Sequence, residues 1–209
     1  MSAIPIKIVR HQPREVVDAV LLTDLLPGVL IETEKEWGPI RREAGRRLHR
    51  QGRFQDLPEH FAWDWGMKSQ KLQFLAYMCF GIEYAQKMQG LLMVKVAGNY
   101  ARLDPDKGKE LVYVDYLEAA PWNVVPLVDE PGFRGIGPML MKTAVELSYD
   151  EGFHGRVGLH SLPQAEEFYR DTCGMQGCGQ DPNYQNLPYY EMTRDIAQRF
   201  TSKSKGDGK

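Results

Sequence analysis

Cysteine is scarce in this 209-residue chain, and the spacing of its three cysteines is not that of a disulfide framework. Cys79 stands apart, and Cys173 and Cys178 are five residues from each other. A small, odd number of cysteines indicates a reducing compartment. We interpret Cys173 and Cys178 as unpaired thiols near a strand, with a disulfide between them as the alternative under oxidising conditions.

Long apolar runs are also missing. The longest candidate, residues 74–96, is interrupted by the polar side chains of Glu83, Gln86, Lys87 and Gln89. It therefore falls short of the roughly 18 continuous apolar residues of a membrane-spanning helix. The first residues contain no basic region followed by an apolar segment, so we see no signal peptide. We expect a cytoplasmic protein that does not bind a membrane.

An excess of charge of one sign is missing as well. The formal net charge is -2, and the hydrophobic and charged fractions, 43% and 26%, are those of an ordinary globular protein. This balance argues against general binding to nucleic acid. Residues 41–53 are the local exception, because they are rich in arginine. We interpret them as a solvent-facing surface, with contact to an acidic substrate, a ligand phosphate or nucleic acid as the alternative.

Several well-known site motifs do not occur. The sequence has no Gly-x-x-x-x-Gly-Lys-Ser/Thr phosphate loop and no Gly-x-Ser-x-Gly nucleophile turn. It has no His-Glu-x-x-His and no paired cysteines at metal-ligand spacing, and the other histidines are scattered, at positions His11, His49, His60 and His154. A P-loop enzyme and a serine hydrolase of that type are excluded, and we expect no metal site.

Hydrophobic periodicity predicts a chain of mixed elements. The predicted strands are residues 4–9, 77–84, 89–96, 111–119, 156–162 and 189–193. The predicted helices are residues 14–26, 39–51, 137–151 and 164–173. Residues 54–68 have no clear period and are interpreted as an irregular connection. We expect one domain over residues 1–200, and a disordered tail over residues 201–209.

The segment from Leu111 to Gly137 carries the chemistry. A continuous apolar strand leads through a loop to Arg134-Gly135-Ile136-Gly137 and directly into a helix. Glycines allow a ligand to approach the backbone, and a helix N-terminus presents unpaired N–H groups at its positive end. This arrangement is typical of a pyrophosphate site. The glycines come late in the chain and do not open a βαβ unit, which argues against a dinucleotide fold.

These residues resemble the acyl-CoA motif of the GNAT superfamily of N-acyltransferases. The resemblance rests on Leu117-Glu118-Ala119-Ala120-Pro121 followed by the Arg134–Gly137 turn. Downstream, Ala165 to Tyr169 and Gly174-Met175 resemble the second motif of that superfamily. The resemblance implies an α/β (mixed α+β) fold. Its twisted mixed sheet would be mostly antiparallel, with about six to seven strands and helices on both faces.

The resemblance also implies roles for individual residues. The backbone of Leu117 and Ala119 would bond the pantetheine arm of acyl-CoA as an added strand. The amides from Arg134 through Gly135, Ile136 and Gly137 to the first helical turn, including Met139, would hold the pyrophosphate. Tyr169 stands at the place of the general acid that protonates the departing thiolate. Trp122 and Asn123 follow the pantetheine strand, where they would line the acceptor site.

The sequence departs from the family pattern at several positions. Gly132 replaces the usual Gln or Arg before the turn, and Arg134 is the residue that would supply the missing charge. Pro138 removes one amide from the pyrophosphate site. The loop before Gly135 is long, and one additional residue separates Tyr169 from the glycine that follows it.

Three residues are candidates for the base that deprotonates the amine. Asp115 and Glu118 are ionisable groups in an apolar strand, where the pKa of a carboxylate tends to rise. They are three residues apart and point to opposite faces, so only one faces the substrate. We favour Glu118, with an ion pair to arginine as the alternative reading. His160 is a third candidate, with a structural hydrogen-bonded histidine as its alternative.

We therefore predict an acyl-CoA-dependent N-acetyltransferase that acylates a primary amine of a small molecule or peptide by direct attack, with no metal. The alternative is a degenerate GNAT-fold module that binds acyl-CoA or a partner protein without turnover. We expect a monomer or a homodimer.

Overall fold

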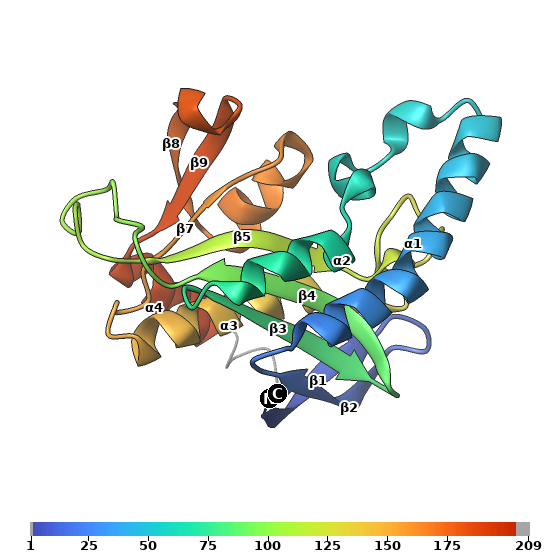
Figure 1. Cartoon of the computed structure of the whole chain (residues 1–209), viewed down its shortest axis with the longest axis horizontal. Coiled ribbons are helices and arrows are strands. Elements are labelled where there is room, and N and C mark those ends of the chain that lie inside the picture. Colours follow the sequence, from blue (N-terminus) through green and yellow to red (C-terminus); the bar gives the residue numbers. More distant parts are fainter. Residues whose placement is uncertain (1, 204–209) are drawn as a thin grey trace. The chain divides into compact units, whose positions relative to one another are not determined.

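The computed structural model describes residues 2–203 (Figure 1). These residues divide into two compact units. Unit 1 holds residues 2–92 and 117–140, and unit 2 holds residues 93–116 and 141–203. The chain passes between the units within strand β4, strand β5 and helix α3. The single domain expected over residues 1–200 stays a prediction.

One mixed sheet of nine strands runs through the described residues in the order β6-β1-β2-β3-β4-β5-β7-β9-β8. The strands are β1 (Ala3–Arg10), β2 (Glu15–Leu22), β3 (Tyr77–Tyr84), β4 (Lys87–Lys95), β5 (Val112–Ala119), β6 (Phe133–Arg134), β7 (Val157–His160), β8 (Gln176–Asp181) and β9 (Leu187–Met192). Strands β5 and β7 pair in parallel, whereas the pairs β1–β2, β1–β6, β2–β3, β7–β9 and β8–β9 are antiparallel. The predicted mixed α/β class is confirmed, with more strands than expected.

The helices of the described residues vary widely in length. The α-helices are α1 (Pro27–Arg50), α2 (Trp65–Lys68), α3 (Ile136–Asp150) and α4 (Arg194–Lys203), and a π-helical turn covers Phe168–Thr172. Short 3-10 turns cover Phe54–Asp56, Glu59–Ala62, Ser69–Gln73, Pro121–Asn123, Pro163–Ala165 and Pro182–Tyr184. No helix within residues 2–203 has the length and apolar character needed to cross a membrane.

The helix predicted over residues 14–26 is wrong, because most of this segment is strand β2. Strand β2 pairs with β1 in a register that runs from Arg10↔Glu15 to Ala3↔Leu22. Burial alternates along it, with Ala19 and Leu21 buried. Its apolar residues fit helical spacing, but three of them are β-branched valines that suit a strand. Pairing with β1 therefore decided between two patterns that the sequence allowed.

Helix α1 begins twelve residues before the predicted start at Pro39. Pro27, expected to stop a helix, instead occupies its first turn, where the missing amide is not needed. Pro39 lies inside the helix on an exposed side, where water can satisfy the carbonyl that loses its bond. The buried residues Leu30, Trp37, Ala44 and Leu48 form the stripe that packs inward.

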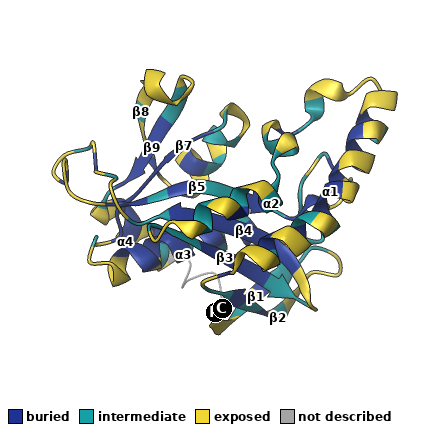
Figure 2. Ribbon diagram, in the orientation of Figure 1, coloured by how far each residue is buried: buried dark blue, intermediate teal, exposed yellow. Residues whose placement is uncertain are grey.

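The β3–β4 hairpin and the elements after it follow the prediction closely. Its turn consists of Ala85 and Gln86, both at positive φ (50° and 61°), as a tight hairpin requires. Residues 88–94 of β4 are all buried (Figure 2). Strand β5, helix α3 and strand β7 also lie where they were expected.

The C-terminal part of the chain departs more from the prediction. The helix expected over residues 164–173 is divided into a 3-10 turn and the π-helical turn. Strand β8 and helix α4 were not predicted. Residues 201–203 of the expected tail belong to α4, and its residues 204–209 lie outside the described part of the chain.

Candidate functional site

Strand β5 changes the side on which it bonds its neighbours. The Val112 amide donates to the carbonyl of Arg156, just before β7, whereas the Ala120 amide donates to the Gln89 carbonyl of β4. In a regular strand, residues an even number apart bond on the same side, so β5 contains a bulge between these positions. The Glu118 carbonyl is already on the β4 side, 3.3 Å from where a Cβ on Gly90 would lie.

The neighbours of Glu118 therefore turn their backbone groups away from β4. These neighbours are Leu117 and Ala119, the residues predicted to bond the pantetheine arm. The ladder between β5 and β7 ends at Val114 and Leu159, before this stretch. The backbone at Leu117 and Ala119 thus forms an edge of the kind that a ligand can extend as an added strand.

The turn before α3 is set by Gly135. Its φ of 82° is left-handed, and no atom of the described residues lies within 4 Å of where its Cβ would be. The Met139 amide donates to the Gly135 carbonyl, and Pro138 has no amide. The amides of Ile136 and Gly137 are left without an intrahelical acceptor at the positive end of the helix. This is the geometry of a phosphate site.

Gly90 of β4 allows this turn to lie beside β5. A Cβ on Gly90 would be 2.4 Å from Ile136 Cγ2, which is too close for two carbon atoms, and 3.1 Å from Leu140 Cδ1, which is a tight contact. The same Cβ would be 3.3 Å from the Glu118 carbonyl. Gly90 therefore touches both the start of α3 and the bulged part of β5, and any side chain there would displace one of them. Sequence reasoning missed this residue, which it treated only as part of an apolar strand.

Trp122 and Asn123 hold the loop that leads to the turn. The Trp122 indole donates to Gln89 Oε1 (2.8 Å), and the Asn123 side-chain nitrogen donates to the Gln89 carbonyl (3.2 Å). Asn123 Oδ1 accepts from the Phe133 amide (2.9 Å), and the Gly132 amide donates to the Trp122 carbonyl (2.9 Å). These bonds position the loop. The role predicted for Trp122 and Asn123 in lining the acceptor site stays a prediction.

The Arg134 side chain is exposed at the turn. Its backbone pairs with Val9 of β1, and its guanidinium lies 3.3 Å from His11 Nε2. The guanidinium is thus held beside His11, and the residue itself directly precedes the Gly135 turn.

Glu118 lies in a buried cluster with Arg41, Glu34 and Trp65. Its Oε1 accepts from Arg41 (2.7 Å), and its Oε2 accepts from the Trp65 indole (2.6 Å). Glu118 and Arg41 are each 3% exposed. Arg41 also donates to Glu34, whose second oxygen accepts from the Trp65 amide (3.0 Å). We call these four residues the Glu118 cluster.

The Glu118 cluster holds two carboxylates beside one guanidinium, with Glu118 and Arg41 buried and Glu34 partly exposed. Burial raises the pKa of Glu118 to about 7, although the charge of Arg41 acts in the opposite direction. The negative charge of Glu34 adds to the rise. Glu118 therefore forms the arginine pair that was its alternative reading, and it also has the pKa near neutrality that suits a general base.

An acid-lined hollow of about 230 Å³ lies beside this cluster in unit 1. It is lined by Glu34, Gly38, Arg41, Arg42, Phe61, Ala62, Trp63 and Asp64. A Cβ on Gly38 would lie 2.7 Å from Glu34 Oε1, so the glycine leaves room for that carboxylate. Two members of the cluster line the hollow, the buried Arg41 and Glu34, whose side chain is 16% exposed.

Tyr169, in unit 2, lies on the π-helical turn. The Cys173 amide donates to the carbonyl of Phe168 five residues earlier (3.1 Å), the bond that defines a π-helix. Such a turn accommodates one residue more than an α-helical turn, which accounts for the longer spacing from Tyr169 to Gly174. Tyr169 is 7% exposed, and burial raises the pKa of its phenol. The hydroxyl is therefore protonated at neutral pH, as a general acid must be.

His160, also in unit 2, has both ring nitrogens engaged. Tyr113 lies 2.8 Å from Nδ1, and Asp181 Oδ2 lies 3.1 Å from Nε2. Arg102 donates to the same Asp181 oxygen (2.7 Å), and the ring stacks on Tyr184 with centroids 3.9 Å apart. Burial lowers the pKa of His160. We call His160, Tyr113, Asp181 and Arg102 the His160 cluster. These contacts are the ones expected of a structural, hydrogen-bonded histidine, which was the alternative to His160 as the base.

Asp115 is half-buried near the same cluster. Burial, followed by the charge of Asp115, raises the pKa of Tyr113. Within residues 2–203, no three histidine, cysteine, aspartate or glutamate side chains are grouped so that they could hold a metal ion.

Neither a protein-family model nor a curated protein sequence matches the chain. Solved structures do match. A GNAT-family acetyltransferase from Listeria monocytogenes has a TM-score of 0.51 at 14% identity, over 90% of this chain and 99% of that one. FeeM, an N-acyl amino acid synthase from uncultured soil microbes, has a TM-score of 0.51 at 12% identity, over 87% and 94%. An uncharacterized protein from Bacillus halodurans has 0.55 at 8% identity, over 97% of each chain.

The chain has the GNAT fold. In this GNAT fold, unit 1 brings together most of the predicted donor-binding and acceptor residues with one candidate base: Leu117, Glu118, Ala119, Trp122, Asn123, Arg134, Gly135, Ile136, Gly137 and Met139. Unit 2 contains Tyr169, Asp115 and His160.

Sequence reasoning missed the residues that support this part of the GNAT fold. Gln89 is a single amide in an apolar strand, and that isolation was a usable signal. Arg41 was assigned to a solvated surface because its neighbours along the helix are also basic. Glu34 and Trp65 gave no signal, since only the folded chain brings them to Glu118.

Proposed function

We propose that this protein is an N-acyltransferase that moves an acyl group, acetyl in the first instance, from acyl-CoA to a primary amine. The observation that carries the proposal is the combination found around Gly90 in unit 1. The Glu118 carbonyl, which lies between the backbone groups of Leu117 and Ala119, and the Ile136 side chain at the start of α3 both lie against this glycine. The open backbone edge at Leu117 and Ala119 and the first amides of α3 are the two features that a pantetheine arm and a pyrophosphate need.

The donor would bind largely through the backbone. Leu117 and Ala119 would pair with the amides of the pantetheine arm, and the amides at Gly135, Ile136 and Gly137 would bond the pyrophosphate, near Met139. Arg134 would add a charge-assisted contact and so compensate for Gly132 and Pro138. Backbone recognition explains how the site can persist in a chain with 8–14% identity to structures of similar fold.

The reaction needs one proton removed and one supplied. The amine nitrogen attacks the thioester carbonyl carbon, an amide bond forms and the carbon–sulfur bond breaks. Glu118 would take the proton that the amine loses, with Glu34 as the solvent-facing carboxylate across Arg41. Tyr169 would give its phenolic proton to the thiolate, because an ordinary phenol and a thiol have similar pKa values, and burial raises the pKa of Tyr169 above that of an ordinary phenol. Asp115 and His160 are the alternative bases.

A second candidate function is binding of acyl-CoA without turnover. The side chain of Glu118 is 1% exposed, and both of its oxygens already accept hydrogen bonds. In this function the Glu118 cluster would be purely structural. Acetyl-CoA would then bind, and no amine would be acylated.

The first experiment measures the thermal shift of the protein with acetyl-CoA, longer acyl-CoAs and free CoA. A ligand that binds only the folded state raises the midpoint as its concentration rises. Gly90→Val should weaken that binding by about tenfold or more, because the start of α3 must move. Gly28→Ala is the matched control, since nothing described lies within 4 Å of its Cβ. Normal acetyl-CoA binding by Gly90→Val would contradict the proposed donor site.

The second experiment separates the two functions. Steady-state acetylation of an amine panel should be detectable for the native chain and reduced by about 100-fold in Tyr169→Phe, with acetyl-CoA binding retained. Binding without any turnover would favour the second function. Full activity of Tyr169→Phe would exclude Tyr169 as the acid.

A further inference from the structure

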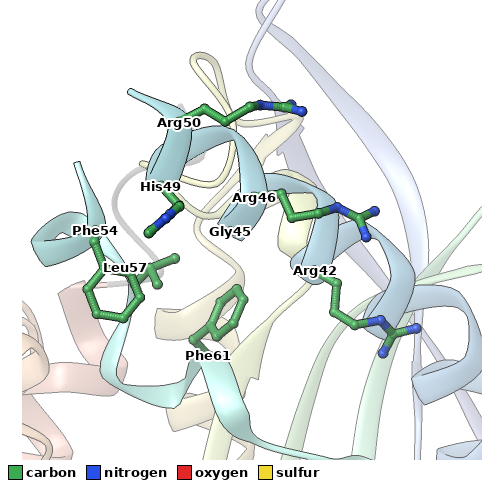
Figure 3. Close-up of a pocket in the computed structure, with 8 residues that line it drawn as sticks. All are labelled: Arg42, Gly45, Arg46, His49, Arg50, Phe54, Leu57 and Phe61. Atoms are coloured by element: carbon green, nitrogen blue, oxygen red, sulfur yellow. The ribbon is translucent and has the colours of Figure 1, made fainter. Parts of the chain in front are cut away.

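The C-terminal half of α1 borders a second hollow, which the proposed donor site does not use (Figure 3). It measures about 460 Å³, within the usual size range of a small-molecule pocket. Its lining residues are Arg42, Gly45, Arg46, His49, Arg50, Phe54, Leu57 and Phe61. We call it the apolar hollow, because Phe54, Leu57 and Phe61 provide its surface opposite the helix.

Gly45 shapes this hollow. A Cβ on Gly45 would lie 2.5 Å from the Phe61 ring, so the ring can lie directly against the helix backbone only because of the glycine. Leu57 and Phe61 also pack against the buried residues Ala44 and Leu48. The apolar surface is therefore built into the fold of unit 1, and Phe54, which is 64% exposed, is its open edge.

The apolar hollow adjoins the acid-lined hollow, because Arg42 and Phe61 line both. Moving along α1, a ligand would pass from the carboxylates of Glu34 and Asp64, past Arg42, to the aromatic surface. One hollow thus offers charges of both signs, and the next offers apolar area.

The arginines along this helix differ in their partners. Arg46 and Arg50 both pair with Glu43, and Arg47 donates to the carbonyls of Pro126 and Leu127. Arg42 has no hydrogen-bond or ion-pair partner among residues 2–203. It is therefore the cation of this segment that is left for an anion, and it lies where the two hollows meet.

We propose that the two hollows together bind the acyl acceptor, and that the acceptor is a hydrophobic α-amino acid. Its ammonium would lie between Glu34 and Asp64, its carboxylate would bind Arg42, and its side chain would extend past Phe61 into the apolar hollow. This proposal rests on the proposed acyl transfer. It also places the ammonium beside Glu34, which shares the Arg41 guanidinium with Glu118.

Calorimetric titration of the full chain without acyl-CoA tests the site. The probes are L-phenylalanine, glycine, 2-phenylethylamine and N-acetyl-phenylalanine, which separate the side chain, the carboxylate and the amine. L-phenylalanine should bind, and each of the others should bind about tenfold more weakly or worse, since each loses one set of contacts. Equal binding of glycine and L-phenylalanine, or no binding of either, would overturn the proposal.

Two variants locate the contacts. Arg42→Gln should remove the preference for L-phenylalanine over 2-phenylethylamine. Phe54→Asp should weaken L-phenylalanine by about tenfold or more, and Phe74→Asp, at a phenylalanine that is 57% exposed and lines neither hollow, should change nothing. An unchanged preference in Arg42→Gln would overturn the carboxylate contact and with it the amino-acid assignment.

Two further measurements distinguish a free amino acid from a peptide N-terminus, and the amino-acid site from the proposed donor site. A phenylalanine-initiated dipeptide amide that binds as tightly as L-phenylalanine would overturn the free amino acid in favour of a peptide N-terminus. The thermal shift with acetyl-CoA reports the donor site alone, so a protein that binds L-phenylalanine but not acetyl-CoA would refute the proposed function and retain the amino-acid site.

Discussion

The Glu118 cluster of unit 1 and the His160 cluster of unit 2 are both networks of hydrogen-bonded polar groups, and the pKa values of Glu118 and Asp181 shift in opposite directions. Burial raises the pKa of Glu118 to about 7. The hydrogen bond from Arg102, followed by that from His160, lowers the pKa of Asp181 to about 2. One carboxylate can exchange a proton near neutral pH, and the other is a permanent anion.

The difference follows from how charge is balanced and where it lies. In the Glu118 cluster, two carboxylates share the single cation of Arg41, and the Arg41 side chain is 3% exposed. In the His160 cluster, Asp181 has Arg102 to itself, and the side chain of Arg102 is 45% exposed. The hydrogen bonds from Arg102 and His160 keep Asp181 charged, whereas burial and the nearby charge of Glu34 raise the pKa of Glu118. Similar contact distances therefore make Glu118 a proton acceptor in unit 1 and Asp181 a permanently charged anchor, a fixed hydrogen-bond acceptor, in unit 2.

Removal of the two arginines should give the largest contrast. At pH 8, Arg41→Met leaves two carboxylates buried without their cation, which costs about 3–5 kcal/mol in the free energy of unfolding. Arg102→Met removes a partly exposed partner and should cost about 1 kcal/mol or less. Urea denaturation measures both. Equal losses would mean that the Glu118 cluster is as well solvated as the His160 cluster.

A control identifies the cause of the larger loss. Arg41→Met should recover stability as the pH falls to 5, because protonation of Glu118 then removes its unpaired charge. A loss that is independent of pH would instead indicate a packing defect.

Local sequence patterns predicted the strands and helices whose signals are short-range. Strands β3 and β5 and helix α3 lie where their periodicity placed them. Strand β2 was misread because its valines satisfy both helical and extended spacing, and only pairing with β1 decided between them. Pro39 was taken as a helix start because proline usually occupies one, whereas α1 tolerates it on an exposed side.

The site was predictable only where it depends on the backbone. The Gly135 turn and the strand at Leu117 and Ala119 have recognisable sequence patterns. The partner of Glu118 is 77 positions away in the chain, so no spacing could reveal it. The Arg41 guanidinium was read as solvent-facing for the same reason, because only tertiary packing buries one arginine of a basic helix and leaves its neighbours exposed.

The second prediction concerns activity. Glu118→Gln should lower kcat/KM by about 100-fold, the usual contribution of a general base, and should retain acetyl-CoA binding. His160→Gln should lower it by less than about tenfold, because His160 is held by Tyr113 and Asp181. Initial rates at saturating acetyl-CoA decide the matter. A larger loss of kcat/KM in His160→Gln than in Glu118→Gln would indicate that His160 is the base.

The third prediction concerns pH. The folded state binds the Glu118 proton more tightly than the unfolded chain, so the free energy of unfolding should fall by at most about 3 kcal/mol as pH rises from about 4.5 to about 7. For Asp181 the sign is reversed, and stability is lost as pH falls from about 4 toward 2. Denaturation midpoints measured across this pH range test both effects. The fall between about pH 4.5 and 7, the upper slope, should disappear in Glu118→Gln, and the fall from about pH 4 toward 2, the lower slope, should disappear in Asp181→Asn. A Glu118→Gln variant that keeps the upper slope would assign it to another group.

The smallest effect is expected from Tyr113→Phe in the His160 cluster. Because Asp181 is an anion that only accepts, His160 must carry its proton on Nε2, and the Tyr113 hydroxyl must donate to Nδ1. Loss of the hydroxyl leaves Nδ1 without a donor and should cost about 1 kcal/mol. The tautomer should not change, since Asp181 sets it, and imidazole nitrogen chemical shifts report it directly. A proton on Nδ1 would mean that Asp181 does not control His160, and the contrast between a proton acceptor and an anchor would no longer hold.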